Sequence, residues 1–587
     1  MEKARIKIGS NDFSRRYSSV HIRQELNWHH HFEVRVLLTD ILDKFKGILS
    51  RTAKEIIGQP IEIALDNSVF HGLVTGLSLN RVRRQANELI ITGGSPTVAM
   101  DEGPNTVSFY EQTLKQMADT LINQYGGKFK GVRISPKSKE KIKYVVQYKE
   151  SNFQFLSRMA AHFGEWFYFN GEEIFFSAKP PQSGDGTIKL YQDKNLLHFD
   201  LAIKAAAVNF KLSGYDYKKH QFLNKEASYN GKLNELTKIA LDKSKGELYS
   251  HTMLTSIHES LSEQDIDQIK TLREQSQVTK MVVLSGSSTE SALRVGSYVQ
   301  LLDDRGDLPG SSEDYGTFII THLEHSFSSS GEDYSNSFEA VPAEVEIPPA
   351  TNPIEPPFCE MQLGEVTENN DPDALGRVRV QFLWQRGTDQ KSPWIRVASP
   401  YSGKDKGFYV IPEAGDQVVV AFEDNNPDRP YMLTGLYNGD SKPEHHHSEN
   451  NLKAIKTKGG HAILMNDEKG KESFGITSPK DVVVTGASGM VTISGQELVT
   501  VESKGNDIVI ESPGTVTIHA KEIIFRADSK ITLQAPTIEA TADAEFTAKS
   551  KQVTIEADAT NTIKGGAMIN IEGTVATNIS GKLIKLN

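Results

Sequence analysis

The sequence predicts a mainly β protein with an α+β first half, small β-barrels and a C-terminal repeat of short strands. Three observations support this fold class. Two amphipathic helical patterns occur before residue 165, and alternating strand patterns fill most of residues 358–440. From about Asp481 the composition changes to a threonine-rich repeat with apolar residues two apart. Alternation with period two indicates half-buried strands, whereas a period near 3.6 indicates helices.

Size and composition narrow the class of protein. The chain has 587 residues, enough for several cores, and a net charge of −11. This acidic balance argues against nucleic acid or anionic lipid as the main partner. The N-terminus lacks the apolar stretch of a secretory signal, and no run of about eighteen apolar residues occurs, so we expect synthesis in the cytoplasm. The single cysteine, Cys359, excludes an intrachain disulfide or a cysteine-based metal site.

A first helix is predicted within "FYEQTLKQMADTLINQYGG". Its apolar residues recur three or four apart, which places them on one helical face. These residues are Leu114, Ala118, Leu121 and Tyr125. We expect the helix to end at Gly126-Gly127, because glycine is the commonest residue after a helix C-terminus.

A second helix is predicted within "SNFQFLSRMAAHFGEWFYFNGEEIFF". Ser151 and Gln154 form a capping box, and Gly164 supplies the C-terminal cap. The predicted buried face comprises Phe153, Leu156, Ala160 and Phe163. Asn170-Gly171 then predicts the turn of a β-hairpin. A helix packed on a hairpin is the expected unit.

Three separate segments share a pattern of two strands. They are residues 57–80, 295–326 and 414–439. In each, a glycine precedes an alternating strand, and a later strand reads VTGL, ITHL or LTGL. Glycine permits a sharp turn before the strand, and alternation indicates one buried face. We predict three small related barrels or sheets, with convergent strand patterning as the alternative.

The third of these segments lies in a region, residues 358–440, that contains only strand and turn patterns. In "GRVRVQFLW", buried and exposed positions alternate: Val378, Val380 and Phe382 against Arg377, Arg379 and Gln381. About five strands follow one another at turn-separated spacing, which predicts a barrel. Such a barrel can bind oligosaccharide or single-stranded nucleic acid, but no aromatic platform joins a basic groove here. We therefore expect a structural adaptor.

A proline-rich segment precedes this barrel. Six prolines fall between Pro342 and Pro357. Proline lacks the N–H group that helices and inner strands require. The segment predicts a stiff linker.

The tail, residues 481–587, is a strand-and-turn repeat. It contains fourteen threonines, no tryptophan, tyrosine or cysteine, and Arg526 as its one arginine. Apolar pairs recur with starts mostly seven to nine residues apart, with the single positions Ile538 and Phe546 between the last two pairs. The pairs are Val491/Ile493, Val499/Val501, Ile508/Ile510, Val516/Ile518, Ile523/Phe525, Ile531/Leu533 and Val553/Ile555. A period of this length with internal alternation excludes a helical heptad.

We expect a lone tail of this kind to stay disordered. Each repeat offers about two side chains for burial, too few to offset a backbone ordering cost of about 1–2 kcal/mol per residue. Winding several copies round one axis would bury the apolar pairs in a shared core and pair every strand edge. We predict an intertwined oligomer, with a single-chain β-solenoid as the alternative.

These motifs together carry a family resemblance. The run from "GRVRVQFLW" to "YMLTGLYNG", then "GGHAILMNDEKGKESFGITSPKDVVV", then the repeat, resembles the valine-glycine repeat protein G (VgrG) family, the spike of type VI secretion systems. Upstream, "VQYKESNFQFLSRMAAHFGEWFYF" is similar to the signature of the family's hub region. The resemblance implies a trimer with an α+β hub of two β-barrels, an oligonucleotide/oligosaccharide-type (OB) barrel and an intertwined trimeric β-helix or prism.

The resemblance also implies the domain order. We expect hub barrel 1 at 1–100, a helix and hairpin region at 101–195, hub barrel 2 at 196–341, a proline-rich linker at 342–357, the OB-fold barrel at 358–440, a neck at 441–480 and the trimeric needle at 481–587. Some relatives carry a muramidase domain before the needle or an effector domain after it. Only about forty residues separate Gly439 from the first repeats, so we expect no fused enzyme.

The search for chemistry leads to the same expectation. The sequence has no Gly-x-Ser-x-Gly elbow, no phosphate-binding loop and no His-Glu-x-x-His helix. We expect no catalytic residue, no metal site and no cofactor. The acidic turn at 423–430 lacks the spaced ligands of a calcium loop and suits a tight turn. "RGD" at 305–307 is a chance occurrence in a predicted acidic loop.

Three histidine clusters are candidates for metal sites. In "HLEH", His322 and Glu324 share one strand face while His325 points away, so a surface strand is favoured. The histidines at 29–31 alternate faces in the same way and indicate the start of a packed strand. Those at 445–447 lie in a polar neck, where a solvated linker is favoured over adventitious metal binding.

The resemblance implies a mechanical function. We expect a trimeric spike at the tip of a contractile tube, exported by its own apparatus and driven through a target membrane, with a hexameric tube protein and baseplate proteins at the hub and effectors or their chaperones as cargo. The spike of a phage-like extracellular injection particle is the first alternative, and a cell-wall hydrolase or a glycan-binding tail protein is the second.

The end of the chain predicts a binding site for a further protein. A β-prism that stops leaves unpaired strand ends and an apolar cross-section, which favour association. The residues expected there are Leu583, Ile584, Lys585, Leu586 and Asn587. Strand addition and apolar contact would hold the partner, and the family resemblance implies a small conical protein of the PAAR-repeat kind.

Overall fold

The computed structural model describes residues 4–14, 16–38, 48–81, 87–182, 186–192, 194–304, 312–329, 333–355 and 357–586. Strands account for 36% and helices for 14% of it, so the prediction of a mainly β protein is confirmed. The chain forms two compact units. The first comprises Met1–Ala454 and Leu464–Phe474, and the second comprises Ile455–Ile463 and Gly475–Asn587.

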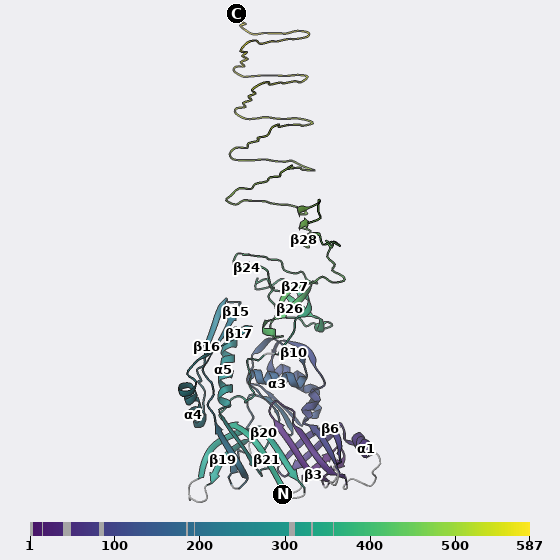
Figure 1. Ribbon diagram of the computed structural model, residues 1–587, viewed down its shortest axis with the longest axis vertical. Coiled ribbons are helices and arrows are strands. Elements are labelled where there is room, and N and C mark those ends of the chain that lie inside the picture. Colours follow the sequence, from purple (N-terminus) through teal and green to yellow (C-terminus); the bar gives the residue numbers. More distant parts are fainter. Residues whose placement is uncertain are drawn as a thin grey trace. The chain divides into compact units, whose positions relative to one another are not determined.

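The strands of the first and second predicted hub barrels join in one 13-stranded sheet. Its strands are β1 (Arg5–Ile8), β2 (Asn11–Asp12), β3 (Tyr17–Glu25), β4 (His31–Leu37), β5 (Pro60–Leu65), β6 (Ser68–Asn80), β7 (Glu88–Gly94), β13 (Ile188–Tyr191), β14 (Leu196–Ile203), β18 (Val282–Ser288), β19 (Tyr298–Asp304), β20 (Ser312–Ser328) and β21 (Asp333–Pro342). The order is β14-β18-β21-β20-β3-β4-β7-β6-β5-β1-β2, with β19 pairing β13 and β20. The antiparallel pair β20 and β3 connects the two halves (Figure 1). A short helix, α1 (Ile48–Ile56), precedes β5.

Alternation explains how this sheet divides its side chains. In β3, Val20 and Ile22 are buried while His21 and Arg23 are exposed. One sheet face therefore covers apolar side chains and the other remains polar, as expected for antiparallel strands. Two large cores result, one centred on the N-terminal strands and one on β18 to β21.

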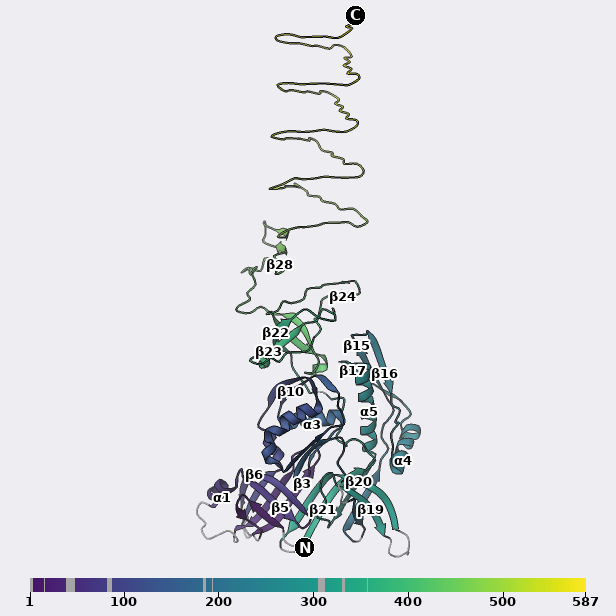
Figure 2. The same cartoon turned by 180° about the vertical axis from the view of Figure 1, so that it is seen from behind.

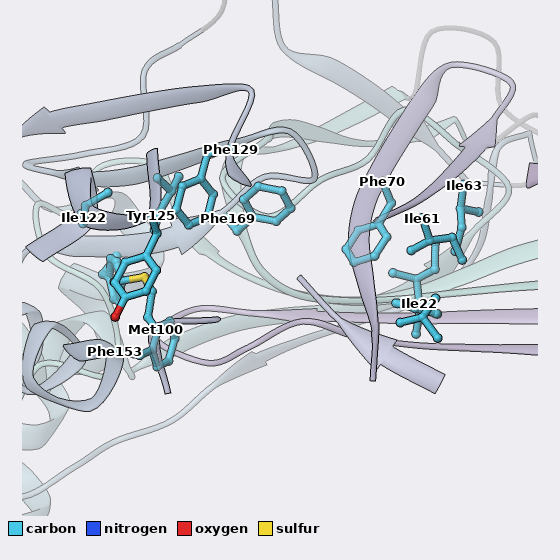
Figure 3. Packing of buried hydrophobic residues seen from close by; sticks show 14 of the residues in the cluster. Ile22, Ile61, Ile63, Phe70, Met100, Ile122, Tyr125, Phe129, Phe153 and Phe169 are labelled. Carbon is cyan, nitrogen blue, oxygen red and sulfur yellow. The ribbon is translucent and has the colours of Figure 1, made fainter. Parts of the chain in front are cut away.

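The helix and hairpin region packs into the N-terminal core. Its elements are η2 (Pro96–Met100), β8 (Asn105–Thr113), α2 (Leu114–Ile122), η3 (Asn123–Lys128), β9 (Gly131–Ser135), β10 (Lys141–Glu150), α3 (Asn152–Phe163), β11 (Trp166–Phe169) and β12 (Glu173–Ser177). Figure 3 shows aromatic side chains of this region, including Tyr125, Phe129 and Phe169, packed close together. The predicted faces of both helices are buried, except that Phe163 is only partly covered.

The predicted ends of the second helix, α3, are confirmed. The predicted end of the first helix at Gly126-Gly127 is wrong, because α2 ends at Ile122 and the two glycines lie within the following 3₁₀ helix, η3. Ser151 and Gln154 form the capping box of α3 in both directions. Gly164 has φ 71°, a left-handed cap in which a Cβ would lie 2.8 Å from Ile347 and Leu272 side-chain atoms. β11 and β12 then form the expected antiparallel hairpin.

Residues 204–280 contain a separate group of strands and helices, here called the arm, where the sequence predicts part of hub barrel 2. It contains β15 (Phe210–Asp216), β16 (Gln221–Glu226), α4 (Glu235–Lys243), η4 (Ser244–Leu248), β17 (Met253–Ser260) and α5 (Glu263–Thr279). Its small sheet, ordered β16-β15-β17, has a core of its own around Phe210, Leu212 and Ile266. Figure 2 shows the β15–β16 hairpin running alongside α5.

The barrel region is built on a four-stranded sheet. Its elements are β22 (Gln362–Glu368), β23 (Arg379–Phe382), η5 (Leu383–Gln385), β24 (Ser402–Gly403), β25 (Lys406–Gly407), β26 (Gln417–Phe422), η6 (Glu423–Asn425) and β27 (Pro430–Gly435). The sheet order is β23-β22-β26-β27, and single bridges at Val378–Ile395 and Val397–Met432 add the segment between. Val378, Val380 and Phe382 are buried as predicted. The expectation for Arg377 is wrong, because its side chain is 4% exposed and forms ion pairs.

The shared two-strand pattern is confirmed at all three places. Gly58, Gly296 and Gly415 have φ of 82°, 88° and 96°, a region that favours glycine. In each case the strand begins two residues later, as β5, β19 and β26, and pairs with the following strand in antiparallel order. The backbone therefore requires glycine at these positions.

The proline-rich segment is packed along the hub. Ile347 is 1% exposed, and Thr351 accepts a hydrogen bond through its carbonyl from Ser276 Oγ at 2.8 Å. Beyond the barrel, the predicted neck contains β28 (Leu452–Lys456), β29 (Ala462–Asn466) and β30 (Ser473–Thr477).

Candidate assembly interface

The tail turns at regular intervals. Bends begin at residues 487, 496, 504, 513, 521, 528, 536, 543, 551, 558, 566, 574 and 582, always seven to nine residues apart. Figure 1 shows this stretch running back and forth in a regular series of turns. The interval matches the spacing of the apolar pairs, so each pair lies on the straight segment after a bend.

Glycine is required at several of these bends. A Cβ on Gly495 would lie 2.6 Å from the Leu498 carbonyl oxygen, and one on Gly573 would lie 2.5 Å from that of Ala576. Gly565 is equally close to Met568. Real Cβ contacts are longer, so a side chain at these positions would force the turn open.

Every apolar pair of the tail is exposed in the single chain. The first members, such as Val499 at 47%, are less exposed than the second members, such as Ile493 at 76%. The remaining members lie in the same range: Val491, Val501, Ile508, Ile510, Val516, Ile518, Ile523, Phe525, Ile531, Leu533, Val553 and Ile555. Burying one such side chain is worth about 1.5–3 kcal/mol. The assignment of these residues to a trimer core stays a prediction.

Hydrogen bonding gives the same picture. In the described part of the tail, no residue belongs to a strand, and the last strand before it, β30, ends at Thr477. Backbone N–H and C=O groups of a native protein are normally paired. The tail therefore combines exposed apolar pairs with a backbone that forms no strand in its described part.

The predicted tip residues are also exposed. Leu583 and Leu586 are 74% and 87% exposed, and Ile584 is 47% exposed. Lys585 is exposed as well. Asn587 lies outside the described residues.

The barrel shares its core with the hub. Tyr144, Val146 and Tyr148 of β10 pack in one cluster with barrel residues that include Val380 and Phe382. The sequence predicts two separate regions, and it does not predict this shared core of β10 and the barrel. The alternation in "KIKYVVQYKE" predicts a strand, but it does not say which element covers it.

Polar contacts reinforce this joint. Gln385 Nε2 donates to Ser108 Oγ at 2.7 Å, and the Val146 amide donates to Asp428 Oδ1 at 2.7 Å. Tyr148 donates to Glu360 Oε2 at 2.7 Å. Hydrogen bonds from Lys149 and Tyr148 lower the pKa of Glu360 to about 2, and burial with the Glu360 contact raises the pKa of Tyr148 to about 12. The carboxylate therefore stays ionised and both partners stay protonated near neutral pH.

Two of the three histidine clusters, at 29–31 and 322–325, make structural contacts. For the cluster at 445–447, the solvated linker stays a prediction. His29 bonds Thr97 Oγ1 and Asp101 Oδ2, each at 2.8 Å, and His30 is fully buried. His322 lies 3.4 Å from Glu324, whereas His325 is buried and bonds Tyr334 at 2.7 Å, as the predicted faces require. His31, the first residue of β4, is exposed.

The described residues offer no site for metal chemistry. No group of three or more His, Cys, Asp or Glu side chains among them could hold a metal ion. The 423–430 turn contains a short 3₁₀ helix, with Asp424 at φ 50°. The "RGD" at 305–307 lies outside the described residues. Among the described residues, no helix combines the length and apolarity needed to span a membrane.

Family comparisons agree with this architecture. Residues 26–331 match the phage tail baseplate hub (GPD) family, which is more than half of the 587-residue chain. The chain belongs to the phage tail baseplate hub family. In this hub protein, residues 362–437 also match the type VI secretion system/phage-baseplate injector OB domain. The prediction of an OB-type barrel is thereby confirmed.

Relatives of this hub protein confirm the resemblance to the VgrG family. The actin cross-linking toxin VgrG1 of Vibrio cholerae is 24% identical over 473 residues, which cover 73% of this chain and 41% of the toxin. The type VI secretion system spike protein VgrG4b of Pseudomonas aeruginosa is 23% identical over 463 residues, covering 70% of this chain and 55% of VgrG4b. The chain thus spans about half the length of these relatives.

A solved structure shares the fold of this hub protein. The Francisella PdpA–VgrG complex gives a TM-score of 0.51 at 10% identity, over 81% of this chain and 80% of that chain. At this identity the likeness concerns the fold.

Proposed function

We propose that the chain is a homotrimeric spike carried at the tip of a contractile secretion tube. The observation that carries this proposal is the tail, where each of the seven apolar pairs follows a bend and its members stay at least 46% exposed in the single chain. Intertwining three copies removes these side chains from water and pairs the strand edges. The hub-family match and the spike proteins among its relatives support the role.

The spike would work by mechanical means. A slender rod with cross-chain hydrogen bonds and no long loops does not open locally under axial load. The barrel, with its core completed by β10, connects this rod to the hub. In this proposal the target membrane is punctured by the shaft, and the chain itself performs no catalysis and needs no cofactor.

Partners at both ends complete the proposal. Two groups of hub strands in each of three chains would present six similar units, which suits a hexameric tube protein below and baseplate proteins around it. At the other end, Leu583, Ile584 and Leu586 would seat a PAAR-like tip protein, with effectors or their chaperones carried along. Export by the contractile apparatus would bring the spike to the extracellular space or the target cell.

Light scattering on the purified full-length chain tests this proposal. We expect a mass about three times the 65.1 kDa of one chain. A particle of one chain mass with a fully protected tail backbone would contradict it, because that result requires a single-chain β-solenoid. Loss of the chain from culture medium when the sheath cannot contract tests the export step.

A further inference from the structure

The tip of the β15–β16 hairpin reaches the barrel. The Lys218 Nζ atom lies 3.1 Å from Asp373 Oδ2, and the Arg396 guanidinium lies 4.6 Å above the Tyr217 ring. Tyr217 also hydrogen-bonds the Arg377 side chain. More than 150 residues of sequence separate the hairpin from this part of the barrel, so the contact is a second connection between hub and barrel.

The hairpin tip has a fixed shape before it meets the barrel. Asp216 Oδ1 accepts hydrogen bonds from the backbone amides of Lys218 and Lys219 at 2.9 and 3.4 Å. His220 adopts φ 53°, and its Nδ1 bonds Tyr215 Oη at 2.8 Å. A turn held in this way loses little conformational freedom when its side chains engage a partner.

The receiving loop of the barrel is equally well ordered. The Asp371 carboxylate accepts amide hydrogen bonds from Asp373, Leu375 and Arg377 at 2.9–3.2 Å. Arg377 forks onto Asp371 at 2.6 and 2.9 Å and reaches Asp373 at 2.6 Å. The Arg377 hydrogen bonds hold the pKa of Asp371 below its ordinary range, and hydrogen bonds from Lys218 and then Arg377 lower the pKa of Asp373.

Charge explains why a lysine completes this loop. The Arg377 and Asp371 side chains are only 4% and 3% exposed, so their charges are largely removed from water. The Asp371 and Asp373 carboxylates share the Arg377 guanidinium, so the three groups together have a net charge of about −1. Lys218 supplies the matching positive charge at Asp373, and its hydrogen bond is the largest cause of the lowered Asp373 pKa.

The arm behind the hairpin is anchored on the hub. Arg273 of α5 lies over the Phe210 ring at 4.4 Å and donates to Thr255 Oγ1 at 2.9 Å, which ties the helix to the small sheet. One turn further along α5, Ser276 Oγ donates to the Thr351 carbonyl. A displacement of the barrel is therefore resisted by the whole arm and by its attachment to the hub.

We propose that the β15–β16 hairpin is a clasp that fixes the orientation of the barrel on the hub. The shared core at β10 is one attachment, and a single attachment between domains leaves bending as the default motion. The clasp adds a second attachment at a different part of the barrel. Its purpose in resisting sideways load rests on the proposed spike function, whereas the clasp itself is a property of one chain.

Hydrogen–deuterium exchange on the full-length protein tests the clasp. In Tyr217→Ala/Lys218→Ala, we expect amides within residues 371–377 to exchange about tenfold faster than in the wild type. Lys219→Ala removes the neighbouring lysine of the same turn, which is exposed, and should leave this rate within about twofold. Amides of α3 serve as an internal reference in all samples.

The outcomes separate this inference from the proposed function. Unchanged exchange at 371–377 in the double variant would overturn the clasp, even if light scattering shows a trimer. Faster exchange at 371–377 would support the clasp even if the particle proves not to be a trimer. Should the double variant fail to fold, Lys218→Met, which keeps the aliphatic stem, must still raise the rate about threefold, and no change there would also overturn the clasp.

Discussion

Acidification should weaken the hub through two buried histidines. His30 is fully buried and His325 is 4% exposed. Burial lowers the pKa of His30 to about 3, with smaller contributions from His29, His31 and His325, and burial with the nearby Arg294 charge lowers that of His325 to about 4. The perturbation is a change from pH 8 to pH 5.

The sign and size follow from proton linkage. Each folded-state pKa lies below the ordinary value of 6.5, so the unfolded chain binds more protons and stability falls as pH drops below 6.5. At pH 5, proton binding to each of these histidines in the unfolded chain lowers the free energy of unfolding by about 2 kcal/mol. The two histidines together lower it by about 4 kcal/mol. Burial also lowers the pKa of His162 to about 4 and lowers the pKa of His29 and His71, so these histidines act in the same direction and add to the effect of the pair.

The pH range from 8 to 5 separates the effect of the histidines on stability from that of the carboxylates. The lowered pKa values of Glu360 and Asp371 start from ordinary values of 4.5 and 3.8, so their stabilising effect is lost only below about pH 5. Measurements between pH 8 and pH 5 therefore report mainly on the histidines.

Urea unfolding followed by tryptophan fluorescence measures the effect, because Trp166 is fully buried in the hub. His325→Gln keeps a partner for Tyr334 and should reduce the loss of stability between pH 8 and pH 5 by about 2 kcal/mol. His21→Gln, on an exposed position of β3, should leave it unchanged. Equal stability at pH 8 and pH 5, or a full pH dependence in His325→Gln, would refute the reasoning.

Three further predictions concern the tail and the barrel. Ile531→Asp should lower the resistance of the oligomer to denaturant by several kcal/mol, since it places one charge per chain in the proposed core, while Thr532→Asp on the other strand face should have little effect; equal midpoints would show a wrong register. Gly415→Ala should destabilise the barrel by about 1–2 kcal/mol in thermal unfolding, because its φ is 96°, whereas Gly435→Ala at an ordinary φ should be tolerated. Deleting Lys582–Asn587 should abolish copurification of the tip protein and leave the mass of the oligomer unchanged; a retained tip protein would place its socket elsewhere.

Local signals made several elements predictable from the sequence. The Ser151–Gln154 capping box and the Gly164 cap act within one helical turn, and both are present as predicted. The glycines before β5, β19 and β26 satisfy a backbone requirement of a few residues. Signals of this range depend on neighbouring residues alone.

Long-range packing was not predictable in the same way. Nothing in the alternation of β10 indicates that Tyr144, Val146 and Tyr148 complete the barrel core. Arg377 occupies an alternating position that suits a solvent-facing side chain, and its burial depends on Asp371 and the arm. The arm itself had a usable signal, since Ser262 and Asp265 form the capping box of α5.

The tail remains the part for which one chain gives an incomplete account. Its period was readable from the sequence, and the bends repeat at the same interval. In the proposed trimer other copies would cover its apolar pairs, and neither periodicity nor the fold of a single chain specifies that surface.

An electron microscopic image of the purified full-length protein tests the central claim most directly. The account predicts a three-fold symmetric globular head that continues into a thin, straight shaft formed by residues 481–587. Heads of one-chain size with no shaft, or with a shaft one chain wide, would contradict the proposal that copies of the tail intertwine into a spike.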